Sequence, residues 1–128
     1  MKIGAQAELA AAKYLSKRGL KLVTQNYHCR FGEIDLILQD GSILVFAEVR
    51  MRNSKFFGGA AASIDSKKQG KLIATAQHYL SGLPHIPPCR FDAVLLQSSG
   101  QPKKSADNNV LIKFDDADIE WIKNAFDA

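Results

Sequence analysis

The sequence predicts an α/β protein in which a mixed central sheet is flanked by helices, with its core elements in the order α-β-β-β-α-β. Helical spacing of apolar side chains marks residues 5–18 and a second segment that begins at residue 66. Alternating or continuous apolar patterns mark strands at residues 20–28, 33–38, 43–51 and 90–97. The connection through the second helix favours a right-handed crossover, which makes the last two of these strands parallel neighbours.

The first predicted helix, residues 5–18, carries one stripe of small and apolar side chains and stops before Gly19, a C-cap candidate. Glu8 lies about 20° from Leu15 on a helical wheel, so its carboxylate falls at the border of the buried face. A carboxylate at this border needs a polar partner, and we therefore expect one for Glu8.

The second and third predicted strands are joined by Asp40-Gly41, a strong signal for a two-residue hairpin turn. With the turn at these residues, Leu38 opposes Ile43 and Leu36 opposes Val45, which gives one entirely apolar face. The opposite face gathers the four charged residues of the hairpin, which are Glu33, Asp35, Glu48 and Arg50.

The second predicted helix starts near Ser66, because Ser66 and Gln69 have the spacing of a capping box. Its apolar side chains repeat with helical period up to Gly82. They are Leu72, Ile73, Ala76, Tyr79 and Leu80.

The remaining segment is polar and then apolar again. Residues 97–109 are rich in Ser, Gly, Pro, Lys and Asn, which predicts a mobile hairpin or lid, and residues 110–114 predict an edge strand. Asp115 or Asp116 is then expected to cap a final helix. Its apolar side chains are Ile119, Ile122 and Phe126.

The length of 128 residues leaves room for a single domain, residues 1–128. Cys29 and Cys89 lack the spacing of a zinc site, and a chain with 46% hydrophobic residues can build a core without disulfides. The amino terminus does not have the pattern of a signal peptide, and no apolar run approaches the ~18 residues of a membrane span. We therefore expect a cytoplasmic protein without a membrane partner.

The charge is unevenly distributed along the chain. Residues 1–114 hold 16 basic and 8 acidic side chains, whereas residues 115–128 hold one basic and five acidic side chains. A basic body suits a polyanionic partner such as nucleic acid, although ordinary surface lysines explain the same excess.

Asp35 and Glu48 are the residues that point to chemistry. Two carboxylates on adjacent strands and on one sheet face can converge on a hard cation such as Mg²⁺ or Mn²⁺. Such an ion lowers the pKa of a bound water and can bind a phosphate, while Arg50 on the same side can stabilise negative charge.

A plain polar face with cross-strand ion pairs is the alternative. Two observations weigh against it. Ile37, Leu44 and Phe46 share this face and imply that it is covered, and three carboxylates against a single arginine are costly without a counterion.

Several motifs of the chain resemble the YraN family of small bacterial proteins. They are GEIDLI at 32–37, VFAEVRMR at 45–52, FG at 57–58, KQ at 68–69, RFD at 90–92 and NAF at 124–126. That family is similar to the restriction-endonuclease-like PD-(D/E)XK superfamily, and most closely to archaeal Holliday-junction resolvases. The resemblance implies a restriction-endonuclease-like α-β-β-β-α-β core.

The resemblance also implies roles for individual residues. Asp35 would be the motif aspartate, Glu48 the glutamate of the E-x-K motif, and Glu8 the helix carboxylate that completes a metal site. Residue 50 departs from the pattern, because the family has lysine where this chain has Arg50, which effectively never loses its proton. Arg52 matches a basic family position and is a candidate phosphate contact or a solvated strand end.

Further candidates could bind a nucleic-acid backbone. Lys67, Lys68 and Lys71 lie near the start of the second helix, although a solvated helix face is the favoured interpretation of these lysines. Gln69 matches a family position but also suits a cap. Phe56 and Phe57 could stack on an unpaired base or fold back onto the core.

Three functions compete at this point. The first is a Mg²⁺- or Mn²⁺-dependent endonuclease for structured or branched DNA, in which Glu8, Asp35 and Glu48 hold the metal, Arg50 stabilises the phosphate and Glu33 is accessory. The second is a nucleic-acid-binding protein that no longer cleaves because of Arg50, and the third is a protein-interaction module. A homodimer that cuts two strands is left open.

Overall fold

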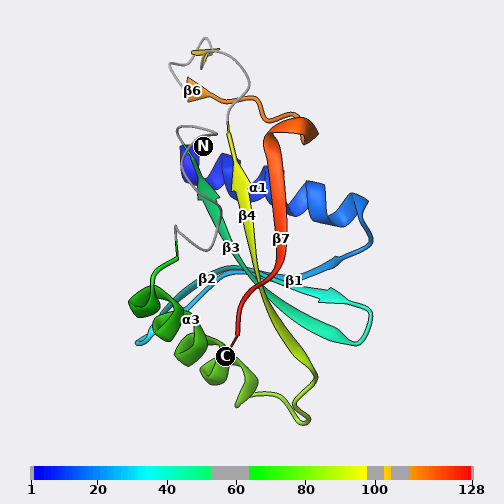
Figure 1. The fold of residues 1–128 in the computed structure, drawn as a ribbon, viewed down its shortest axis with the longest axis vertical. Coiled ribbons are helices and arrows are strands. Elements are labelled where there is room, and N and C mark those ends of the chain that lie inside the picture. Colours follow the sequence, from blue (N-terminus) through cyan, green and yellow to red (C-terminus); the bar gives the residue numbers. More distant parts are fainter. Residues whose placement is uncertain (1, 53–63, 98–102, 105–109, 128) are drawn as a thin grey trace.

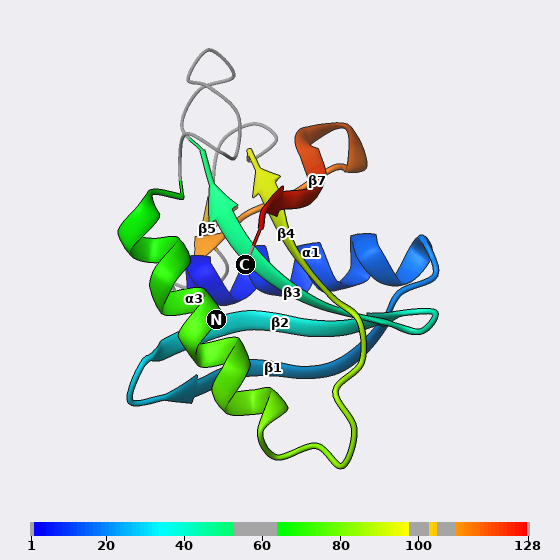
Figure 2. The same cartoon turned by 60° about the horizontal axis from the view of Figure 1, so that its bottom comes forward.

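The computed structural model describes residues 2–52, 64–97, 103–104 and 110–127. One mixed sheet has the strand order β1-β2-β3-β4-β7, with α1 over one face and α3 over the other (Figures 1 and 2). The helices and sheet strands are α1 Ile3–Lys17, β1 Lys21–Cys29, β2 Gly32–Asp40, β3 Ile43–Met51, α3 Ser66–Leu80, β4 Cys89–Leu96 and β7 Ile119–Phe126. The predicted α-β-β-β-α-β order is confirmed, as is the parallel pairing of β3 with β4.

Both faces of the sheet are covered by a helix. Ala7, Ala11 and Leu15 of α1 pack on the face that carries Leu36 and Leu38. Leu72 and Ala76 of α3 pack on the other face, with Ile37, Leu44 and Phe46. The expectation that Ile37, Leu44 and Phe46 are covered is confirmed. Of the charged residues of the hairpin, Glu48 is buried with them, whereas Glu33 is exposed.

The predicted hairpin register is wrong by two residues. Asp40 opposes Ile43, Leu38 opposes Val45 and Leu36 opposes Ala47, so the turn is Gly41-Ser42. Gly41 has a φ of +62°, which glycine adopts easily, and Asp40 is held in the strand by Arg90 at 3.1 Å. The pairing ends at Leu36 with Ala47, so Asp35 and Glu48, the next residues along each strand, lie where the two strands part.

The last segment is a strand, not the predicted helix. A short 3₁₀ turn, η1 (Asp116–Asp118), precedes β7, which pairs antiparallel with β4. The register shifts between Phe91 and Ala93, and Asn124 has a φ of +52°. This irregularity breaks the two-residue alternation, so the apolar positions of β7 show a helix-like spacing although they belong to a bulged strand.

Two smaller expectations also need correction. Asp65, not Ser66, caps α3, because its Oδ1 accepts a hydrogen bond from the Lys68 N–H at 2.8 Å, and the Gln69 side chain donates to the Ile64 carbonyl. The predicted edge strand at 110–114 is reduced to β6 (Val110–Leu111), which pairs with β5 (Lys103–Lys104) outside the main sheet.

Two predictions fall wholly or mainly outside the described residues. Phe56 and Phe57 are not among them, and neither is most of the predicted lid at 97–109. Among the helices that the structure describes, none is long and apolar enough to cross a membrane.

Candidate carboxylate site

Asp35 lies where β2 and β3 separate. The last residue pair between these strands is Leu36 with Ala47, and β2 then continues alongside β1 only (Figure 2). Ile34 packs with the α3 side of the sheet whereas Leu36 packs with the α1 side, so the alternation of faces is interrupted at Asp35. Asp35 Oδ2 accepts a hydrogen bond from the Val49 N–H at 2.8 Å, which fixes the carboxylate between the two strands.

Glu48 is the most deeply buried carboxylate of the cluster, with 7% of its surface exposed. The pKa of Glu48 is raised to about 8, first by burial and then by the hydrogen bond and negative charge of Asp35, whereas the charges of Lys68 and Arg50 oppose the rise. Lys68 Nζ lies 3.5 Å from Glu48 Oε2. Oε2 is buried and accepts no hydrogen bond from the described residues, so its contact with Lys68 is electrostatic and becomes an ion pair when Glu48 ionises.

Glu8 approaches Asp35 from α1. Partial burial raises the pKa of Glu8, and the charge of Asp35 adds to this effect, whereas a hydrogen bond from Asn26 opposes it. The partner that the helical wheel required for Glu8 is therefore Asp35 together with Asn26. Asp35 is the shared member of the cluster, since it interacts with both Glu8 and Glu48.

Asn26 is a site residue that sequence reasoning missed. It faces Asp35 across the β1–β2 ladder, because its neighbours Gln25 and Tyr27 pair with the residues on either side of Asp35. With its amide nitrogen turned inward, Asn26 donates to Glu8 Oε1 at 2.8 Å and to Glu33 Oε1 at 3.1 Å. Asn26 has a φ of +54°, a conformation that asparagine tolerates better than most residues. An asparagine inside a predicted strand was therefore the only hint of this position in the sequence.

The fit to a divalent cation is tested by these contacts. Asp35 and Glu48 are adjacent oxygen donors with a buried, under-coordinated Oε2, which suits a hard cation. Within the described ranges, however, no three Asp, Glu, His or Cys side chains are spaced to surround one ion. Asp35 and Glu48 thus fit as a metal-binding pair, and Glu8 fits as a neighbour of Asp35 rather than as a third ligand in this conformation.

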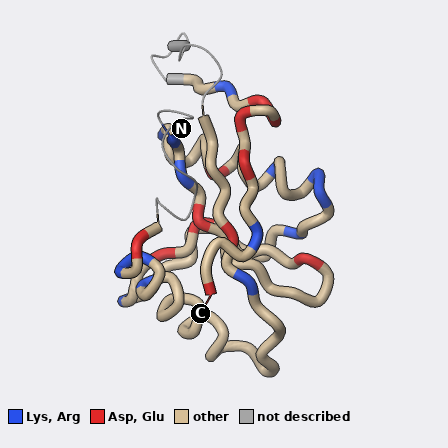
Figure 3. Tube along the Cα trace, viewed as in Figure 1, with Lys and Arg blue, Asp and Glu red and all other residues tan. Residues whose placement is uncertain are grey.

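The basic candidates divide into two groups. Arg50 and Lys68 lie close enough to Glu48 for their positive charges to lower its pKa, whereas Lys67 and Lys71 are exposed on α3. Basic positions at the start of α3 stand beside acidic positions of the sheet (Figure 3). Arg52 is bound to Glu120 of β7 at 2.8 Å, so it is not directed into the cluster.

Asp92 is a structural carboxylate. It is 1% exposed, and its oxygens accept hydrogen bonds from Arg90, from the Trp121 indole and from the Asn124 N–H, all within 3.1 Å. These bonds tie β7 to β4 at the register shift. Each Asp92 oxygen therefore already accepts two hydrogen bonds, which leaves no acceptor position for a ligand.

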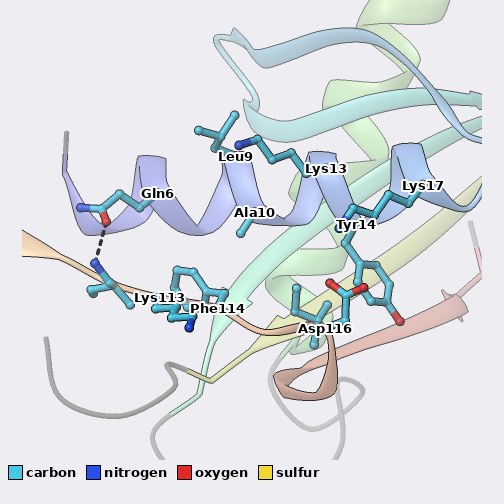
Figure 4. Close-up of a pocket in the computed structure, with 11 residues that line it drawn as sticks. Gln6, Leu9, Ala10, Lys13, Tyr14, Lys17, Lys113, Phe114 and Asp116 are labelled. Carbon is cyan, nitrogen blue, oxygen red and sulfur yellow. Dashed lines mark hydrogen bonds between the residues drawn. The ribbon is translucent and has the colours of Figure 1, made fainter.

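A cavity of about 350 Å³ lies on another face of α1 (Figure 4). It is bounded by α1 and by the segment at residues 112–119, which Gln6 holds by accepting a hydrogen bond from the Ile112 N–H at 2.9 Å. None of the predicted site residues lines it. The cavity is thus separate from the carboxylate cluster.

The fold and the cluster define a small α/β protein in which a helix-covered sheet carries an acidic site, with the buried Glu48 beside the basic start of α3. The chain belongs to the uncharacterised protein family UPF0102, which matches residues 7–96. All residues of the cluster lie inside this range.

Relatives in the same family match over nearly the whole chain. A UPF0102 protein of Nitrosomonas europaea is 49% identical over 124 residues, which cover 97% of this chain and 92% of the relative. One of Methylobacillus flagellatus is 48% identical over 126 residues, covering 98% and 97%, and one of Nitrosococcus oceani is 49% identical over 125 residues, covering 96% and 90%.

Proposed function

We propose that this protein is a Mg²⁺- or Mn²⁺-dependent endonuclease of the restriction-endonuclease-like PD-(D/E)XK superfamily that hydrolyses phosphodiester bonds in structured or branched DNA. The observation that carries the proposal is that Asp35, held at 2.8 Å by the N–H of Val49, lies beside the buried Glu48 at the point where β2 and β3 separate. The motif resemblance supplies the substrate class.

The acidic cluster explains why a cation is expected. A buried Glu48 beside Asp35 is costly in its charged form, which its raised pKa expresses. A divalent cation would relieve this repulsion, with Asp35 and Glu48 as its ligands and Glu8 supporting Asp35. When bound, such an ion supplies an activated water and screens the phosphate.

The chain's own residues would hold and orient the substrate. Val49 fixes the Asp35 carboxylate through its N–H, and Asn26 holds Glu8 and Glu33 through its amide. Arg50 points to the same side of β3 as Glu48 and would bind a phosphate oxygen through its guanidinium. Lys67 and Lys71 are exposed on α3, where they would contact the DNA backbone without reading its sequence.

The test is incubation of the protein with four-way-junction, fork and plasmid DNA in Mg²⁺ or Mn²⁺. Wild type should cleave at least one of them, and Glu48→Gln, which keeps the shape of the side chain but cannot ionise, should not. Asp127→Asn, which alters an exposed carboxylate outside the cluster, should cleave like wild type. Equal cleavage by Glu48→Gln and wild type would refute the proposal.

A nucleic-acid-binding protein without nuclease activity is the second candidate. Arg50 in place of the family lysine favours it, because a guanidinium can clamp a phosphate but effectively cannot give up a proton. This candidate predicts tight binding of branched DNA that weakens steeply with salt, together with no cleavage at any Mn²⁺ concentration.

A further inference from the structure

Lys68 has a different environment from its neighbours on α3. Asp65 fixes the first turn of the helix by accepting from the Lys68 N–H, and Gln69 binds back to Ile64. This anchoring helps to direct the Lys68 side chain to the sheet, where Nζ lies 3.5 Å from Glu48 Oε2. Lys67, the preceding residue, is exposed and is paired with no carboxylate that the structure describes.

Arg50 is the other cation near Glu48, but it is placed differently. Its Nε is buried and makes no hydrogen bond to a described residue, and its charge affects Glu48 less than the charge of Lys68 does. The Lys68 side chain is 38% exposed, although its ammonium lies beside a buried carboxylate. An ammonium has three donors and can therefore serve two anionic partners.

We propose that Lys68 is the cation of the carboxylate site that faces the phosphate. Its ammonium stays in contact with the Glu48 carboxyl group until a divalent cation and a phosphodiester bind. This inference rests on the proposed function. Glu48 would then lose any bound proton to solvent, give up its contact with Lys68 and coordinate the metal through its carboxylate. The ammonium, held in place by the capped start of α3, would turn to a non-bridging oxygen of the scissile phosphate, whose negative charge increases in the transition state.

Two effects of opposite sign follow for Lys68→Met, which keeps the length of the side chain and removes its charge. Binding of Mn²⁺ alone, measured by titration calorimetry without DNA, should tighten about fivefold or more, because a positive charge next to a metal ligand is removed. Cleavage of four-way-junction DNA should slow about tenfold or more in kcat, with a smaller change in KM.

Two control variants separate this role from a structural one. Lys21→Met removes the same charge at an exposed position of β1, outside the carboxylate cluster, and should leave Mn²⁺ affinity and kcat within about twofold of wild type. Lys68→Arg keeps the charge and should keep the Mn²⁺ affinity near that of wild type. Urea unfolding of each variant checks that the protein is folded at the assay pH.

The outcomes distinguish this inference from the proposed function. If wild type cleaves DNA and Lys68→Met shows the same Mn²⁺ affinity and kcat, the role of Lys68 is refuted and the nuclease proposal stands. If wild type neither binds Mn²⁺ nor cleaves, both are overturned. Opposite changes in Mn²⁺ affinity and kcat that are specific to Lys68 would support the inference.

Discussion

Glu48 should make the stability of the metal-free protein depend strongly on pH. The folded state holds the proton of Glu48 with a pKa of about 8, and the ordinary value is 4.5. Because the folded pKa is the higher one, the contribution of Glu48 is favourable below pH 4.5 and is lost as the pH rises to about 8. At about 1.4 kcal/mol per pKa unit, the full loss amounts to about 5 kcal/mol.

Most of this loss falls in an accessible pH range. Between pH 5 and pH 9 the linkage relation gives about 4 kcal/mol. Glu48→Gln cannot ionise, so its free energy of unfolding relative to wild type should increase by about this amount over that range. The assay is urea unfolding in EDTA at each pH for both proteins.

Other titrating groups cancel in the comparison, and Asp127→Asn gives the baseline for an exposed carboxylate. Asp35, Lys68 and Arg50 surround Glu48, so all three must stay unchanged in the test variant. A stability difference between Glu48→Gln and wild type that stays within about 0.5 kcal/mol from pH 5 to pH 9 would refute the reasoning. Under the proposed function, saturating Mn²⁺ should also reduce the pH dependence, because a bound cation favours the charged carboxylate.

Three further predictions concern the fold. Asp92→Ala should lower the free energy of unfolding by about 3–5 kcal/mol in urea titrations, because Arg90 loses a buried partner; a loss below about 1 kcal/mol would contradict this. Asp65→Ala should cost about 1 kcal/mol and Ser66→Ala much less, and equal costs would argue against the observed cap. Gly32→Ala should lower stability by about 1–3 kcal/mol, measured by urea unfolding, since φ is +152° and the new Cβ would lie 3.2 Å from Thr75 Oγ1; an unchanged midpoint would contradict it.

The periodic patterns predicted both helices and four strands of the main sheet to within a few residues. They worked because each element presents one or two faces to a core, and the spacing of apolar side chains records those faces. β7 was missed for the same reason. Its bulge at Asn124 shifts the apolar positions to a helix-like spacing, and only pairing with the free edge of β4 reveals the strand.

The sequence identified the charged residues of the site, but not the residues that they contact. Asp35 and Glu48 could be selected because like charges on a covered face are costly. Asn26 and Lys68 could not be assigned to the cluster, because each comes from an element whose distance to β2 and β3 is set by packing. The interruption at Asp35, which lets it reach both Glu8 and Glu48, also depends on how β2 leaves β3 to follow β1.

The sequence by itself determined the order of the core elements, the parallel crossover and the acidic residues that gather near the hairpin, since all of these follow from local spacing and residue type. Only the tertiary structure decided the hairpin register, the cap of α3, the last strand and the pairing of Lys68 with Glu48. These features depend on contacts between distant segments, whose geometry is fixed by the packing of two helices on opposite faces of one sheet.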